Sequence, residues 1–90
     1  MGPGDEAETI AGSGTVVVES RDVAWFERID LSGEGTVEVA IGGEPSLTIE
    51  TDDNLMEYIE TSVRGGILTI EFRDGVQLDP SNGITYDIVV

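Results

Sequence analysis

The most restrictive feature of this sequence is an alternation of apolar and polar residues, in segments that are separated by glycine. The clearest segments are residues 36–41, 46–50, 68–73 and 84–90. A period of two places the apolar side chains on one face of a β-strand, against a core, and the polar ones on the other face, in water. Weaker segments of the same kind include 15–19 and 28–31. The pattern therefore predicts an all-β domain.

Two local signals refine that prediction. Gly65-Gly66 separates residues 61–64 from residues 67–72, and two glycines between alternating segments favour a two-residue hairpin turn. Around residues 53–59, apolar residues recur at a helical spacing, at Leu55, Met56 and Ile59. We therefore expect one short helical turn there, which acts as a corner or a cap on the sheet.

The size of the chain limits it to a single small domain. Ninety residues bury only about 60–65% of the surface that the unfolded chain exposes, so the core is marginal. The sequence has no Cys and no His, which excludes disulfides, thiolate or imidazole metal sites and a serine–histidine triad. No catalytic residues are predicted, and the remaining means of stabilisation are oxygen-ligated cations and self-association.

The charge of the chain restricts its partners. A formal net charge of −15 is repelled by nucleic acid and by anionic lipid surfaces, so we expect no nucleic-acid partner. No apolar stretch is long enough to span a bilayer, so no membrane insertion is expected either. A signal-peptide pattern is also not visible in the sequence.

Acidic side chains suggest one kind of ligand, a hard cation such as Ca²⁺, which prefers carboxylate and carbonyl oxygens. The candidate ligands are Asp52, Asp53, Asn54, Asp74 and Asp79. None of them fits the spacing of an EF-hand loop. The alternative interpretation is that the first three begin a helix and that the other two form turns.

Trp25 and Phe26 are adjacent aromatic residues. Neighbouring residues of a strand point to opposite faces, so we expect one ring in the core and the other partly exposed. An exposed aromatic ring suits an interface or a contact with a surface glycan. The alternative is a ring that covers the edge of the core.

One continuous run resembles a known family. Residues 21–39, RDVAWFERIDLSGEGTVEV, are similar to the opening of the family described as "putative auto-transporter adhesin, head GIN domain", in which an R-x-V-x-x-F-x-x-I run leads into a G-x-G turn and a V-x-V strand. The similarity continues through residues 46–50, 53–55, 58–61, 66–70 and 84–90. This resemblance implies an extracytoplasmic bacterial cell-surface protein with a right-handed β-helix-like fold and no catalytic residues.

The resemblance and the patterns together give the prediction that the structure can test. We expect an N-terminal tail at residues 1–14 and a single β domain at residues 15–90, a short irregular β-helix or β-sandwich. An apolar last strand leaves an open end, which a second copy of the chain can cover to give a homo-oligomer or a filament. The predicted self-association residues are Thr9, Ile10, Ile84, Tyr86, Ile88 and Val90. The alternative function is an acidic module that binds Ca²⁺ or carbohydrate.

Overall fold

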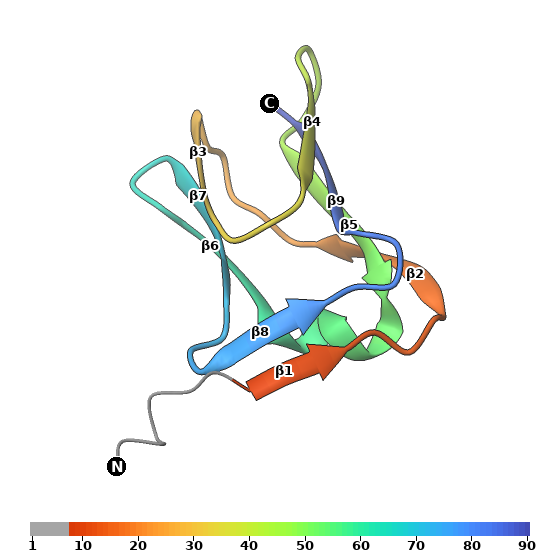
Figure 1. Cartoon of the computed structure of the whole chain (residues 1–90). Helices are drawn as coiled ribbons and strands as arrows, with labels where there is room; N and C mark the ends of the chain where they lie inside the picture. Colours follow the sequence, from red (N-terminus) through yellow and green to blue (C-terminus); the bar gives the residue numbers. More distant parts are fainter. Residues whose placement is uncertain (1–7) are drawn as a thin grey trace.

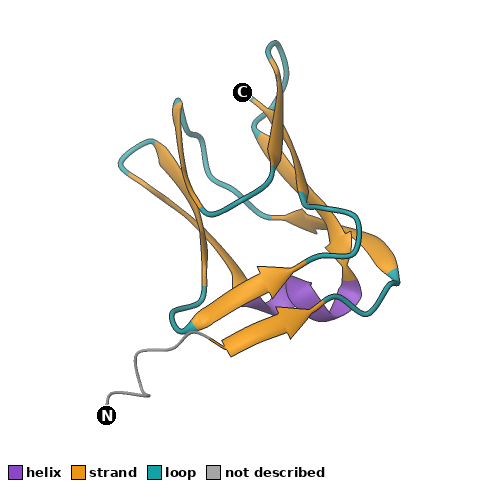
Figure 2. Ribbon diagram, viewed as in Figure 1, coloured by secondary structure: helices purple, strands orange, loops and turns teal. Residues whose placement is uncertain are grey.

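The computed structural model describes residues 8–90, which form nine strands and one short 3₁₀ helix (Figure 1, Figure 2). The strands and the helix are β1 (Glu8–Ala11), β2 (Val16–Arg21), β3 (Arg28–Ser32), β4 (Thr36–Ala40), β5 (Ser46–Asp52), η2 (Asp53–Tyr58), β6 (Ile59–Arg64), β7 (Ile67–Phe72), β8 (Val76–Asp79) and β9 (Thr85–Val89). The prediction of an all-β domain is confirmed, and so is the short helical turn that follows residue 52.

The strands of residues 8–90 form three separate sheets. One sheet has the order β2-β5-β9-β4, the second has the order β3-β7-β6, and the third contains only β1 and β8. Figure 1 shows the three sheets as the sides of a triangle, with β1 and β8 at its base. The consecutive strands β7, β8 and β9 contribute one strand to each side. Each of these three strands has a parallel neighbour, which is β3, β1 and β4 respectively.

The core lies inside this triangle and is built from the alternating residues that the sequence identified. Leu47 and Ile49 of β5, Leu68 and Ile70 of β7, and Tyr86 and Ile88 of β9 are buried. The Tyr86 hydroxyl donates a hydrogen bond of 3.3 Å to the carbonyl of Glu34. Burial raises the pKa of Tyr86 to about 12, so this hydroxyl stays protonated and remains a donor.

The turn between β6 and β7 has the predicted geometry. Gly65 and Gly66 both have positive φ, at 59° and 79°, which residues with a side chain rarely adopt. Two consecutive positive φ values are typical of the tight turn that suits the twist of a hairpin. The antiparallel pairing of Arg64 with Ile67 directly beside the turn confirms the predicted hairpin.

Two strands were not predicted. β1 lies in the segment that the sequence suggested was a tail, but Glu8–Ala11 pairs in parallel with β8. The rest of that segment up to residue 7 lies outside the described residues. β8 is also short, and Val76 and Leu78 are its only inward-facing apolar residues. Each strand has only four residues, which is too short for its alternation to be recognised in the sequence, and each is held in place by pairing with the other.

Candidate interaction surface

The two ends of the triangular core are closed by different elements. On one side of β7 and β9 lie β6 and β5, and the helix η2 connects these two strands. We call this side the closed end, because η2 buries Leu55 and Met56 against the sheets. On the other side of β7 and β9 lie β3 and β4. We call this side the open end, because no helix follows or precedes these two strands.

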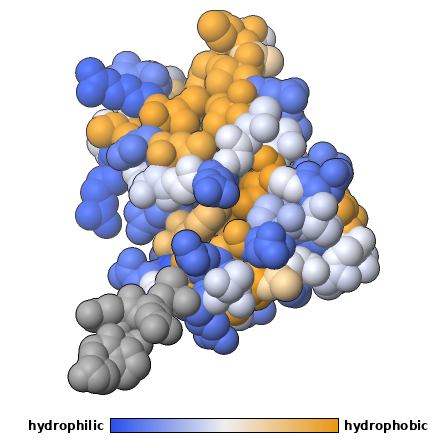
Figure 3. All heavy atoms as spheres, viewed as in Figure 1, coloured by the Kyte–Doolittle hydropathy of each residue, from blue (hydrophilic) through white to orange (hydrophobic). Residues whose placement is uncertain are grey.

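At the open end, β4 is exposed along its whole length. In the parallel register, Val37 lies opposite Tyr86 and Val39 lies opposite Ile88, so both valines share the inner face of the sheet with core residues. Nevertheless, 36% of Val37 and 50% of Val39 are exposed, and Ile41, just beyond the strand, is 87% exposed. Figure 3 shows apolar atoms gathered over the upper and central parts of the molecule. The inner face of β4 is therefore an uncovered continuation of the core.

The backbone of β4 is unpaired on one edge within residues 8–90. Thr36 donates its N–H to the carbonyl of Ile84 at 2.8 Å, and the carbonyl of Ala40 accepts from Val90 at 3.0 Å. Since backbone groups of alternate residues point to opposite edges of a strand, those of Val37 and Val39 point to the free edge. Exposed side chains and free backbone groups therefore lie on the same two residues of β4, Val37 and Val39.

The aromatic pair next to β3 is arranged as the sequence predicted. Phe26 is buried in the core, with 2% of its surface exposed, whereas Trp25 is 65% exposed. The Trp25 ring lies near Gly66, in the turn between β6 and β7. The prediction of one buried and one exposed ring is confirmed, and a glycan contact at Trp25 stays a prediction.

The predicted self-association residues occupy different places. Ile84, Tyr86 and Ile88 are buried, and β9 pairs with β5 on one edge and with β4 on the other. β9 is therefore not an open edge, contrary to the expectation from the sequence, because β4 lies along it in parallel. Val90 is half-buried, and on β1 Thr9 is exposed and Ile10 half-buried. The free edge beside β9 belongs to β4.

Among the predicted cation ligands, Asp52 is fully buried and holds the closed end together. Its carboxylate accepts hydrogen bonds from the N–H of Gly14 (2.9 Å) and from both the hydroxyl (2.6 Å) and the N–H (2.9 Å) of Ser81. A Cβ added at Gly12 would collide with this carboxylate, so only glycine fits there. The hydrogen bond from the Ser81 hydroxyl is the main reason why the pKa of Asp52 is lowered, and burial opposes it.

The next two residues connect the same loop to η2. Asn54 accepts from the N–H of Ser13 and donates to the carbonyl of Ala11, both at 2.9 Å, and Asp53 accepts from the Ser13 hydroxyl. Asp52 is the N-cap residue of η2 but makes no side-chain capping bond, so these residues bind the β1–β2 loop and not the helix. Asp74 and Asp79 are exposed. Within residues 8–90 no group of three or more acidic residues is arranged to hold a metal ion, and a cation site stays a prediction.

The combination of a three-sided, all-β core and an apolar open end defines the class of this protein as a small β-sheet module with an uncovered strand edge. Its sequence matches the family "putative auto-transporter adhesin, head GIN domain" over residues 25–90, and the chain belongs to this family. The predicted resemblance is confirmed. No curated protein matched the chain.

Solved structures show the same fold. A putative adhesin from Bacteroides fragilis superposes with a TM-score of 0.80 at 20% identity, covering 89% of this chain and 38% of that chain. A putative adhesin from Parabacteroides merdae superposes with a TM-score of 0.76 at 21% identity, covering 92% of this chain and 35% of that chain. A putative lipid binding protein from Parabacteroides distasonis superposes with a TM-score of 0.77 at 20% identity, covering 91% of this chain and 37% of that chain. The chain thus spans little more than a third of these proteins. In the described part, no helix could cross a membrane.

Proposed function

We propose that this chain is a non-enzymatic adhesive or structural module of the bacterial cell surface, which associates with copies of itself through the free edge of β4. Family membership supports the adhesive role, and the three parallel strand pairs support a β-helix-like winding with a stackable end. The described residues have no disulfide to compensate for the small core. Covering the open end is one route by which this domain would gain buried surface.

The observation that carries the proposal is the exposed inner face of β4. A long, apolar strand with an unpaired edge is a ready template for pairing with another chain, and natural proteins usually protect such edges with charge, proline or a bulge. β4 contains only one charged residue, Glu38, and no proline. Its valines share the inner face of the sheet with the core, so a partner strand would extend both the sheet and the core.

The sequence of β4 favours pairing registers that keep Glu38 away from its copy in the partner. Two copies of β4 can pair antiparallel about a two-fold axis, which gives a closed dimer. Centring that axis on Glu38 would place two like charges directly opposite each other, which is unfavourable. Centring it on Val39 places valine opposite valine, Glu38 opposite Ala40 and Val37 opposite Ile41. This register uses the free backbone groups of Val39 and separates the two carboxylates, so it is the register we propose.

The experiment compares three versions of the 90-residue chain by light scattering over a range of protein concentrations. The unmodified chain is expected to form dimers or larger species, more strongly as salt screens its net charge. Val39→Asp and Val39→Lys, each alone, are expected to be monomers, because like charges would face each other. An equimolar mixture of the two is expected to recover the dimer, because opposite charges then meet across the axis.

Val18 provides the matched control. It is 64% exposed on β2, which is the other edge strand of the same sheet. Val18→Asp and Val18→Lys should leave the mass measured in solution by light scattering the same as that of the unmodified chain. A monomeric unmodified chain at every concentration and salt level would overturn the proposal. Equal disruption by the Val18 variants, or no recovery in the mixture, would overturn the assignment to β4.

A further inference from the structure

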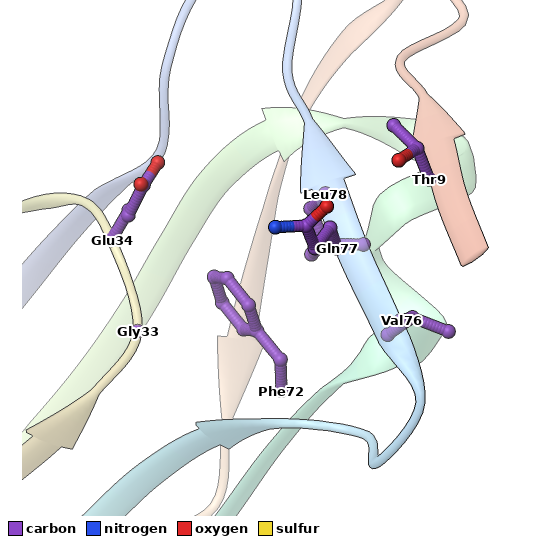
Figure 4. Close-up of a pocket in the computed structure, with 7 residues that line it drawn as sticks. All are labelled: Thr9, Gly33, Glu34, Phe72, Val76, Gln77 and Leu78. Carbon is purple, nitrogen blue, oxygen red and sulfur yellow. The ribbon is translucent and has the colours of Figure 1, made fainter. Parts of the chain in front are cut away.

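A second feature of the open end lies at the base of the triangle, between β8 and the Gly33–Gly35 connection. Two neighbouring cavities of about 310 and 270 Å³ occupy this space and share Glu34, Phe72 and Leu78 in their walls. Figure 4 shows Glu34 and the Phe72 ring on one side of the larger cavity and β8 on the other. β3 and β4 extend the other two sides of the triangle, but here a connection without strand structure takes the corresponding position.

The edge of β8 that faces this space carries free backbone groups. The carbonyls of Gly75 and Asp79 accept hydrogen bonds from β1, at 2.9 Å from Glu8 and 2.8 Å from Gly12. Alternate residues of a strand point their backbone groups to opposite edges, so those of Val76 and Leu78 point away from β1. Within residues 8–90 no strand pairs with that edge. The groove therefore offers hydrogen-bond partners for one more short strand.

The charge of the groove indicates the kind of strand it would accept. Glu34 is the one charged residue among the described residues that line the two cavities, and none of the four arginines of the chain is among them. The apolar part of the lining includes Phe72 and Leu78. A carboxylate above apolar walls suits a segment that alternates apolar and basic side chains, and the net charge of −15 attracts such a segment from a distance.

We propose that this groove binds a short, extended, basic peptide segment of another protein, which pairs with the free edge of β8 and places a lysine or arginine against Glu34. This mode is strand addition, in which backbone hydrogen bonds supply affinity and alternate side chains supply specificity. The groove reaches Thr36 at the start of β4 but is not lined by Val37 or Val39, so variants at Glu34 and at Val39 test binding here and self-association there separately.

The probe is a blocked peptide of alternating valine and lysine, about five residues long to match the four residues of β8. Binding is measured by calorimetry and by NMR shifts of the amides of Val76 and Leu78. We expect saturable binding to the unmodified chain. Glu34→Lys is expected to weaken it by about tenfold or more, because the charge-assisted contact becomes a repulsion.

Two controls separate this site from general attraction to an acidic protein. Glu44→Lys makes the same change in net charge at an exposed loop position outside both cavities, and should alter the affinity by less than about twofold. The same peptide with a fully N-methylated backbone keeps its charge but cannot donate to β8, and should not bind. Equal losses for the two variants, retained binding of the methylated peptide, or no binding of the original peptide would each overturn the proposal.

Discussion

The closed and open ends of this molecule are built from the same kind of alternating strands, yet only one of them buries its apolar side chains. At the closed end, η2 places Leu55 and Met56 over the core, and Asp52 fixes the β1–β2 loop and Ser81 beside them. At the open end, Val37 and Val39 point to the same core but remain exposed. The difference shows that alternation determines which face of a strand is apolar, whereas coverage depends on what is connected to the strand.

The largest effect should come from removing apolar atoms at the two ends. Leu55→Ala at the closed end should lower the free energy of unfolding by about 2–4 kcal/mol, because the side chain is fully buried and leaves a cavity. Val39→Ala at the open end should change it by less than about 0.5 kcal/mol, because half of the side chain is already in water. Urea unfolding at low protein concentration, where the chain is monomeric, measures both. Similar losses would show that the open end is covered within the monomer.

The next largest effect concerns the polar part of the closed end. Asp52→Asn should lower the midpoint of thermal unfolding at pH 7, because an amide cannot accept all the hydrogen bonds that Gly14 and Ser81 donate to the carboxylate. Asp30→Asn, an isosteric change on the exposed face of β3, is the matched control for the loss of one charge. An equal fall in both variants would mean that the hydrogen bonds of Asp52 contribute nothing.

The same variant also tests a dependence on pH. The pKa of Asp52 is lower in the folded chain than its ordinary value of about 3.9, so the folded state favours the ionised carboxylate. The resulting stabilisation is complete above the ordinary pKa and is lost as the pH falls through the folded value. Thermal unfolding followed from pH 7 to pH 2 should therefore show a smaller acid-induced loss in Asp52→Asn than in the unmodified chain. If the thermal midpoint fell equally with pH in both chains, the lowered pKa of Asp52 would be contradicted.

A smaller effect should distinguish the pairing on the two sides of β9. Towards the open end, Glu38 lies opposite Asp87 in the parallel register, which places two carboxylates together. Towards the closed end, Asp87 lies opposite Thr48, a favourable neighbour. Glu38→Thr should therefore stabilise the fold by about 0.2–1 kcal/mol by removing the repulsion. Glu50 lies opposite Thr85, not opposite another carboxylate, so Glu50→Thr is the control. An equal gain in stability in that variant would show that only the net charge matters.

The sequence predicted the strands that carry their own alternation, such as β4, β5, β7 and β9, and the glycine hairpin, because these signals are local. It did not predict β1 or β8, which are short and depend on each other. It also placed the free edge at residues 84–90, because nothing in the alternation of a strand shows whether its neighbours are present. Only the parallel pairing of β4 with β9 moves the exposed edge to Val37 and Val39. Likewise, the roles of Asp52 and Gly12 depend on contacts with residues distant in sequence.

The smallest effect is expected from calcium at the closed end. The predicted ligands there already accept hydrogen bonds, Asp52 from Gly14 and Ser81 and its two successors from Ser13. A cation at these oxygens would have to displace those donors, so we expect the thermal midpoint to rise with Ca²⁺ only as far as it rises with Na⁺ at equal ionic strength. A rise that saturates with Ca²⁺ at constant ionic strength, and that disappears in Asp53→Asn, would contradict this expectation. It would also reverse the comparison, because the closed end would then contain the binding site.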